Sequence, residues 1–391
     1  MMREGNGKKA GDSAGCPYAK KCGGCSGAAM PYKDTLTEKQ KRLRKQLARF
    51  GTVEPVTGMA EPFHYRNKVH AAFGRSNTGQ ILCGTYEAKS HKIIPIETCL
   101  IEDKVSREIV LTVRDLVRAL KLKIYDEDLR QGFVRHVLVR RAFGTGEILV
   151  ALVTADSRFP LKKAFVKGLL DRHPEITTIV MNINDRRTSM VLGDREIVLY
   201  GSGRIRDRLC GRDFVLSARS FYQVNPVQTE VLYRKAIELA DLTGRETVLD
   251  AYCGIGTIGM IAADKAKSVI GVELNPEAVR DAIQNAKINR LKNVRIFRGD
   301  AGKVMTEMAA EGEHFDVVFM DPPRSGSDEA FLKAVMKAAP RKVVYVSCNP
   351  ETLARDLTTL TRRYHVERIC PVDMFPFAEP HVETVVCLSD K

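Results

Sequence analysis

Three segments of the sequence end in side chains that could do chemistry together. The apolar run 343–346 is followed by SCNP, which indicates a buried parallel strand with Cys348 at its carboxyl end. A second apolar run ends in the turn DPPR, which begins with Asp321, and the extended stretch HVETV carries Glu383. Ligands of an open α/β sheet bind at the carboxyl ends of its strands. A thiol and two carboxylates are therefore expected to meet at one edge of a sheet.

A cysteine at such an edge could act as a nucleophile. A thiol with an ordinary pKa of about 8.5 is only slightly ionised at pH 7, yet it is already strongly nucleophilic. Addition of the Cys348 thiolate to C6 of a pyrimidine would create an enolate whose C5 can accept a methyl group. Glu383 could then remove the C5 proton as a general base, so that the cysteine leaves. The alternative is that Cys348 is a small buried hydrophobic residue, as most lone cysteines are.

The residues from Glu246 onward alternate between strands, turns and helices. Apolar stretches are followed by glycine-rich or Asp-Pro turns, and a clear helical pattern covers 276–289. This alternation predicts an α/β fold class with a doubly wound, Rossmann-like parallel sheet. The expected strands cover 247–250, 268–274, 294–300, 315–323 and 342–350.

The first turn of this predicted sheet is rich in glycine. Asp250 ends the strand, and three residues separate it from the first glycine of a GxGxxG pattern. A dinucleotide site places its glycine turn directly on the helix that holds a pyrophosphate. The wider spacing favours a zwitterionic cofactor such as S-adenosylmethionine over NAD(P). Glu273, which ends the second strand, could accept hydrogen bonds from ribose hydroxyls, and Asp300, which ends the third, could contact an adenine.

Three parts are expected along the chain. Residues 1–50 hold a cysteine-rich segment and a basic amphipathic helix at 32–50, whose charged face is either solvated or in contact with RNA or a neighbouring domain. Residues 51–205 show short strands with turn signals, including a hairpin around the GTG of 144–146, and predict a strand-rich domain. Residues 206–391 hold the predicted parallel sheet.

The charge of the chain favours a polyanionic partner. Its 391 residues include 62 basic and 48 acidic ones, for a formal net charge of +14, and such an excess favours binding to phosphates. Seven basic residues fall on the predicted strands of the central part, where they either form one phosphate-binding face or are scattered solvated charges. They are Arg66, Lys68, His70, Arg75, Arg135, Arg140 and Arg141.

The sequence shows no signal for a membrane or for secretion. No apolar run approaches the roughly 18 residues of a membrane span, and the first fifteen residues lack the apolar core of a signal peptide. We therefore expect a cytoplasmic protein, in which cysteines are not expected to form structural disulfides.

Three cysteines near the amino terminus have the spacing of metal ligands. Cys16, Cys22 and Cys25 are separated by five and by two residues, and a fourth ligand could come from Cys83 or Cys99. No second close pair of cysteines is present, as a zinc ribbon would need. An iron–sulfur cluster and zinc both remain open on spacing alone, and free thiols are the third reading.

Several motifs together resemble the RNA 5-methyluridine methyltransferases, the family of bacterial 23S rRNA and tRNA uracil-C5 enzymes. The resemblance covers nearly the whole chain. It is carried by the cysteine triplet and by FYQVNPVQ, LDAYCGIGTIG, GVELNPEAV, MDPPRSG, VYVSCNPETLARDL and MFPFAEPHVETVVCL.

The resemblance implies a role for individual residues. Cys348 matches the nucleophile and Glu383 the proton-abstracting base of a reaction that uses S-adenosylmethionine. Cys16, Cys22, Cys25 and Cys99 match the ligands of a [4Fe–4S] cluster, which leaves Cys83 as a spare and zinc as the weaker alternative. Positions that match cofactor or substrate-pocket residues are Gln223, Tyr252, Glu273 and Asp321, with Asp300 beside them.

The resemblance also bears on the RNA substrate. The tRNA-specific branch generally lacks the cysteine cluster, so 23S rRNA is the expected target and tRNA the alternative. Many members begin with a small β-barrel RNA-binding domain, whereas fifteen residues precede Cys16 here. We therefore expect that domain to be missing and the central part to bind RNA, in a monomer without an obligate protein partner.

Other activities fit the sequence less well. An RNA 5-methylcytosine enzyme is expected to carry a cysteine beside the DPPR turn, and an amino-group methyltransferase an aromatic residue where Arg324 stands. A metal-stabilised RNA-binding protein without catalysis is a further alternative, which would leave Cys348 and Glu383 unused.

Overall fold

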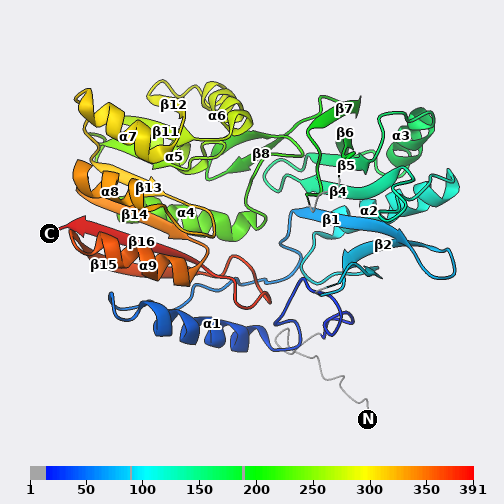
Figure 1. Ribbon diagram of the computed structural model, residues 1–391, viewed down its shortest axis with the longest axis horizontal. Helices are drawn as coiled ribbons and strands as arrows, with labels where there is room; N and C mark the ends of the chain where they lie inside the picture. The colour runs from blue at the N-terminus through cyan, green and yellow to red at the C-terminus, as the bar shows by residue number, and fades with distance from the viewer. Residues whose placement is uncertain (1–14, 89, 187–189) are drawn as a thin grey trace, which may run out of the picture.

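A computed structural model of the protein describes residues 15–88, 90–186 and 190–391. Within these residues the strands form two seven-stranded sheets and a two-stranded hairpin. The two large sheets lie side by side, with the carboxyl-terminal one on the left in Figure 1. Residues 1–14 of the expected segment 1–50 lie outside the described residues.

The carboxyl-terminal sheet has the strand order β12-β11-β10-β13-β14-β16-β15. Neighbours from β12 to β14 run parallel, and β16 is antiparallel to both β14 and β15. The predicted doubly wound α/β sheet is thus confirmed, and β15 is an addition to the expected strands. The strands are β10 (Thr247–Ala251), β11 (Ser268–Glu273), β12 (Val294–Arg298), β13 (Val317–Met320), β14 (Lys342–Ser347), β15 (Tyr364–Val372) and β16 (Glu383–Asp390).

Successive side chains of these strands point to opposite faces of the sheet. Val248 lies in the core shared with α4, α5 and α6, whereas the next residue, Leu249, lies in the core shared with α7, α8 and α9. In the described part of the chain, none of the helices is both long and apolar enough to cross a bilayer. The six helices named here are α4 (Pro226–Ala240), α5 (Thr257–Ala262), α6 (Pro276–Ile288), α7 (Ala301–Ala310), α8 (Glu329–Ala338) and α9 (Pro350–Leu360).

Helix α1 (Tyr32–Leu47) joins the carboxyl-terminal half although it lies near the start of the chain. Leu43 and Leu47 are fully buried in the core under α9, and Arg42 pairs with Glu351 of α9 at 2.9 Å. Figure 1 shows α1 running beneath β15 and α9. The apolar face of this basic helix therefore packs on a neighbouring domain.

The central sheet has the order β3-β2-β1-β4-β5-β6-β7. The strands β4 and β5 pair antiparallel, which confirms the hairpin predicted around residues 144–146. Helices α2 and α3, which were not predicted, cover one face and share a core with Val69 and Val137. The elements are β1 (Lys68–Arg75), β2 (Ile81–Tyr86), β3 (Ile93–Pro95), α2 (Lys104–Ala119), β4 (Val134–Arg141), β5 (Ile148–Thr154), α3 (Lys162–Leu170), β6 (Ile176–Ile183) and β7 (Arg195–Tyr200).

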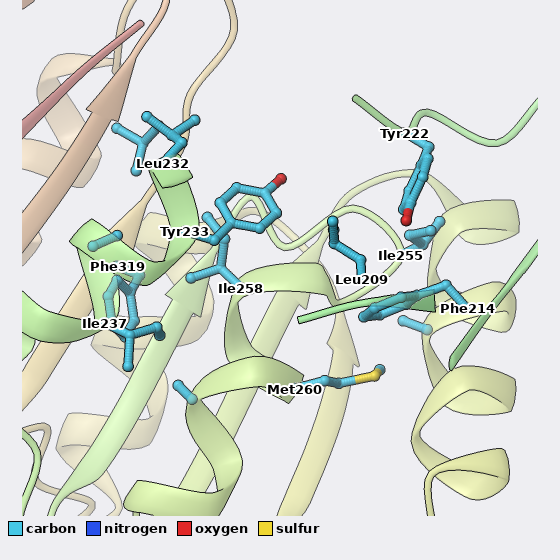
Figure 2. Packing of buried hydrophobic residues seen from close by; sticks show 14 of the residues in the cluster. Leu209, Phe214, Tyr222, Leu232, Tyr233, Ile237, Ile255, Ile258, Met260 and Phe319 are labelled. Carbon is cyan, nitrogen blue, oxygen red and sulfur yellow. The ribbon is translucent and has the colours of Figure 1, made fainter. Parts of the chain in front are cut away.

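A hairpin of β8 (Ile205–Leu209) and β9 (Arg212–Leu216) connects the two halves through a shared core. Leu209 and Phe214 belong to the same buried cluster as Leu138 of the central sheet and Ile258 of α5. Figure 2 shows Leu209 and Phe214 close to the glycine-loop residue Ile255. The hairpin thereby fixes the central sheet relative to the glycine loop.

Candidate active site

A cavity of about 740 Å³ opens where the carboxyl ends of the parallel strands face the central sheet. It is lined by all of the predicted catalytic and cofactor residues except Asp300. Those that line it are Gln223, Tyr252, Glu273, Asp321, Cys348 and Glu383.

Asp321, Cys348 and Glu383 form what we call the acidic wall of the cavity. Asp321 follows β13 and Cys348 follows β14, whereas Glu383 is the first residue of β16. These three strands are neighbours in the sheet, and the register places Ser347 opposite Thr384. The order and direction of the strands therefore bring the three groups to one edge, as the sequence predicted.

Burial dominates the electrostatics of the acidic wall. Burial first, then the charge of Asp321, raises the pKa of Glu383 to about 8 against the opposing charge of Arg324, and burial raises the pKa of Asp321 itself to about 7. The pKa of the Cys348 thiol rises to about 11, again through burial first and then through the two carboxylates, while Arg324 opposes the shift. At neutral pH the thiol of the free protein is therefore protonated. Such clustered shifts in a cavity are typical of catalytic sites.

The glycine loop after β10 places the carboxylate of Glu273 at the cavity. Its two oxygens accept the backbone N–H groups of Gly254 at 3.1 Å and Asn275 at 2.7 Å. The loop is held from behind by Asp250, which accepts the N–H of Gly259 at 2.8 Å. A Cβ atom at Gly259 would lie only 2.8 Å from the same carboxylate, so the third glycine of the motif is required by close packing.

The remaining predicted cofactor residues differ in their placement. Tyr252 lines the cavity, and its hydroxyl lies 3.0 Å from that of Ser327. Gln223 is 9% exposed and also lines the cavity. Asp300 is exposed and caps α7 by accepting the N–H of Lys303 at 3.0 Å. Asp300 and Glu273 were both predicted as cofactor residues because each ends a predicted strand, but only Glu273 lines the cavity.

Arg66 and Lys68 form what we call the basic wall, on the central sheet. Both residues line the cavity, and burial first, followed by the charges of Arg140 and Arg66, lowers the pKa of Lys68 to about 7. Phe221, which is 70% exposed, lies on the rim beside Gln223. The FYQVN motif led us to predict Gln223 as a site residue but not Phe221. An aromatic residue two positions before a candidate site residue could have been recognised in the sequence.

The seven basic residues of the central part do not form one surface. Arg140 is fully buried and donates to the carbonyl of Ser220, and Arg135 donates to that of Asn184. Arg141 pairs with Asp103 and Arg75 donates to the carbonyl of Gly79. His70 and His136 contact each other at 3.3 Å. Neither of the two readings of these seven residues is right for the whole set. Arg140 and Arg135 are buried with backbone partners, so they belong neither to one exposed phosphate-binding face nor to a set of scattered solvated charges.

Comparison with known proteins decides the family. A family model described as tRNA (Uracil-5-)-methyltransferase matches residues 31–391. This chain belongs to the tRNA/RNA uracil-5-methyltransferase family. Two relatives are uncharacterized RNA methyltransferases: one of Halalkalibacterium halodurans, 45% identical over 384 residues (97% of this chain, 83% of that protein), and one of Staphylococcus aureus, 42% identical over 381 residues (96% and 84%).

A solved structure agrees with this assignment. The Pyrococcus abyssi tRNA (uracil-54, C5)-methyltransferase in complex with S-adenosyl-L-homocysteine superimposes with a TM-score of 0.80 at 30% identity, covering 94% of this chain and 86% of that one. Family membership confirms the predicted enzyme class, an S-adenosylmethionine-dependent RNA methyltransferase, and the predicted fold.

Four cysteines of this family member lie near one another at the amino-terminal end of α1. Burial first, then the charges of Cys99, Cys22 and Cys16, raises the pKa of Cys25 to about 12. Cys25 and Cys99 pack against one apolar cluster that includes Phe377. Among the described residues, no group of three or more histidines, cysteines or carboxylates is placed to share a metal ion. Cys83 is buried in the core of the central sheet, a different cluster from the one that Cys25 and Cys99 contact.

Proposed function

We propose that this enzyme transfers a methyl group from S-adenosylmethionine to C5 of a uridine in RNA, through a covalent bond between Cys348 and C6. The observation that supports this most is the convergence of Cys348, Glu383 and Asp321 on one edge of the sheet beside the glycine loop. A nucleophile and a base that face one cavity are what the chemistry needs.

The cofactor site fits S-adenosylmethionine in the character of its donors and acceptors. Glu273 presents a carboxylate fixed by two backbone N–H groups, which suits the two hydroxyls of a ribose. Tyr252 and Gln223 line the same cavity, and Asp300 follows the carboxyl end of the neighbouring strand β12. When bound, S-adenosylmethionine supplies an electrophilic methyl group on a sulfonium.

The residues of the acidic wall perform the two halves of the reaction. Cys348 loses its proton to water, and its sulfur forms a bond to C6, which moves the electron pair of the C5–C6 double bond towards C5 and O4. C5 then takes the methyl group as the sulfonium bond breaks. Glu383 removes the C5 proton, the C5–C6 double bond forms again, and the bond between sulfur and C6 breaks to release the Cys348 thiolate.

The shifted pKa of Glu383 suits its proposed role. A general base works best when its pKa lies near the working pH, and burial brings that of Glu383 to about 8. Asp321 stands between the base and the glycine loop and adds a like charge that keeps the pKa of Glu383 high. Because the cavity is recessed, the target uridine leaves its stack to reach Cys348.

For the four cysteines we propose a structural [4Fe–4S] cluster held by Cys16, Cys22, Cys25 and Cys99, with zinc as the alternative. Cys99, Cys22 and Cys16 all raise the pKa of Cys25, and the Cys99 sulfur lies within reach of the backbone N–H groups of Ile101 and Glu102. Sulfurs of bound clusters commonly receive such N–H groups. Iron and acid-labile sulfide analysis of protein purified without oxygen tests this, and zinc in the same analysis would favour the alternative.

The RNA substrate that we propose is 23S rRNA. The cysteine set supports it, because the resemblance places such clusters in the rRNA branch. The named activity of the Pyrococcus abyssi neighbour, which acts on uracil-54 of tRNA, favours tRNA instead.

One experiment tests the reaction and the substrate together. Mass spectrometry maps every 5-methyluridine in ribosomal and transfer RNA from a strain that lacks the gene. Loss at 23S positions, restored by the wild type but not by Cys348→Ala or Glu383→Gln, is the expected result. Loss in tRNA alone would keep the reaction and overturn the substrate, and restoration by Cys348→Ala would overturn the covalent mechanism.

A further inference from the structure

A segment with no regular secondary structure directly precedes Glu383 in the chain. Residues 373–382, which we call the base-carrying segment, connect β15 to β16 and end directly before Glu383. Phe375 and His381 of this segment also line the cavity. The position of the proposed base therefore depends on what holds this segment.

Five consecutive carbonyl groups of the base-carrying segment, from residues 373 to 377, each accept a hydrogen bond from outside it. Buried backbone groups need partners, and each of these carbonyls has one from a distant part of the chain. The carbonyl of Phe375 also accepts the N–H of Ala378, within the segment, at 3.0 Å. The donors, in the order of the carbonyls, are Gln228 Nε2, Asn225 Nδ2, Lys39 Nζ, Tyr65 Oη and the N–H of Gly27, at 3.1, 3.0, 2.9, 3.1 and 2.8 Å.

The charged member of this set is Lys39, on the buried side of α1. Its ammonium group contacts Asp373 Oδ1 at 2.6 Å and the carbonyl of Phe375 at 2.9 Å, and both charged side chains are fully buried. Tyr32, two turns earlier on the same face of α1, donates to Asp373 Oδ2 at 2.8 Å and accepts the N–H of Met59. The carboxylate of Asp373 in turn accepts the N–H of Phe375 at 3.2 Å.

A buried ion pair of this kind is costly to form and is not needed to attach a helix to a core. Leu43 and Leu47 already anchor α1 by apolar contact, and apolar residues at Lys39 and Asp373 would serve stability as well or better. The pair instead constrains the conformation of the backbone. It fixes the turn of the chain at Asp373 and the position of the Phe375 carbonyl, and it therefore determines the path of the backbone towards Glu383.

We propose that Lys39, with Tyr32 and Asp373, is a positioning residue that holds the base-carrying segment so that Glu383 can remove the C5 proton. The inference rests on the proposed function, because it assigns the network to one step of that reaction. Cys348 and Glu273 reach the cavity on other strands, β14 and β11, that do not depend on this segment. Loss of the network therefore affects proton removal more than methyl transfer.

A defect in proton removal alone can be detected directly, because it leaves a covalent adduct between the enzyme and the RNA. If the methyl group is transferred but the C5 proton is not removed, the enzyme stays bonded to methylated RNA through Cys348. This adduct survives denaturing electrophoresis as a slower band. A loss of general stability would instead lower formation and resolution of the adduct together.

The test compares Lys39→Met with the double variant Lys39→Met/Asp373→Asn in the full chain, in single turnovers with saturating RNA and labelled S-adenosylmethionine. The single variant leaves Asp373 buried without its cation, whereas the double variant removes both charges and restores an uncharged core. In the double variant we expect methyl transfer within about threefold of the wild type. Resolution of the adduct should slow by about 10- to 100-fold, because a misplaced base loses its alignment with the C5 proton.

Matched controls separate the possible failures. Lys41→Met, on the exposed side of the same helix, should resolve the adduct at the wild-type rate. Glu383→Gln should accumulate adduct, and if it does not, the proposed mechanism has failed rather than the positioning role. If Glu383→Gln accumulates adduct but the double variant resolves it normally, or slows both steps equally, the positioning role is wrong. Should the double variant not fold, Tyr32→Phe, which removes one hydrogen bond to Asp373, is measured in the same way and decides the question.

Discussion

The two walls of the cavity hold ionisable groups that burial has shifted in opposite directions. On the acidic wall it raises the pKa of Glu383 to about 8 and that of Cys348 to about 11. On the basic wall it lowers the pKa of Lys68 to about 7. In both cases the low-dielectric surroundings disfavour the charged form. The free cavity is therefore less charged than its residues suggest.

The opposite pKa shifts of the two walls suit the chemical group that each wall is proposed to contact. In the proposed reaction an uncharged uracil meets the acidic wall, where the groups must lose protons for the reaction to proceed. We expect a phosphate of the RNA at the basic wall, where an approaching anion favours the charged lysine. Binding of RNA should therefore restore charge on one wall, while chemistry requires ionisation of the other.

The largest expected effect is that of removing the nucleophile from the acidic wall. Cys348→Ala should lower methyl transfer by about 10⁴-fold or more, because the covalent route is lost while binding remains. Labelled methyl incorporation into RNA measures the rate, and calorimetry with S-adenosylhomocysteine checks the cofactor site. Cys210→Ala, at a half-buried cysteine outside the cavity lining, should leave the rate unchanged. Equal losses in the two variants would contradict a specific role for Cys348.

The acidic wall also predicts the pH dependence of the reaction. In the proposed mechanism Cys348 acts deprotonated and burial raises its pKa to about 11, so kcat/KM, which covers the steps up to methyl transfer, should increase with pH and should not reach a plateau between pH 6 and 9. The increase should be about tenfold per pH unit. Initial rates in a constant-ionic-strength buffer series measure the profile. A plateau already at pH 7 would mean that the thiol is activated by another group.

The burial of Glu383 should also affect how the free energy of unfolding depends on pH. The folded-state pKa of Glu383 lies above its ordinary value of 4.5, so the cost of ionising it is absent below pH 4.5, grows as the pH rises and is complete above about pH 8. At pH 7, Glu383→Gln should increase the free energy of unfolding by about 3 kcal/mol, and at pH 4.5 by little. Urea unfolding at both pH values measures this. Glu307→Gln, at an exposed glutamate of α7, should show no such difference between the two pH values.

The acidic wall was predictable from the sequence because strand order and polarity determine which residues share an edge. Cys348 and Asp321 follow strands whose apolar runs are unmistakable, and Glu383 starts a third. Asp300 shows the limit of this rule. It also follows a strand, but its carboxylate caps α7 rather than reaching the cavity, and the end of a strand alone does not distinguish the two outcomes.

The supports of the site were not predictable in the same way. Lys39 looks like one more lysine of a basic helix, and its partner Asp373 lies 334 residues away. Nothing local distinguishes it from Lys41, which is exposed. The basic wall was likewise hidden among seven basic residues, since the burial of each depends on how strands from distant parts of the chain pair.

The smallest expected effect concerns the basic wall. Lys68→Met keeps most of the apolar stem and removes one cation, so the Kd for RNA should increase by about tenfold and the slope of log Kd against log salt should fall by about one. Because burial brings the pKa of Lys68 to about 7, wild-type binding should weaken between pH 6 and 8, and binding by the variant should change less. Fluorescence anisotropy in a Cys348→Ala background measures this without turnover. Lys163→Met, at an exposed lysine of α3 on the opposite side of the central sheet, should change neither value. If both variants lost the same affinity for RNA, Lys68 would contribute only to the overall positive charge of the protein. The contrast between the two walls would then be supported by the acidic wall alone.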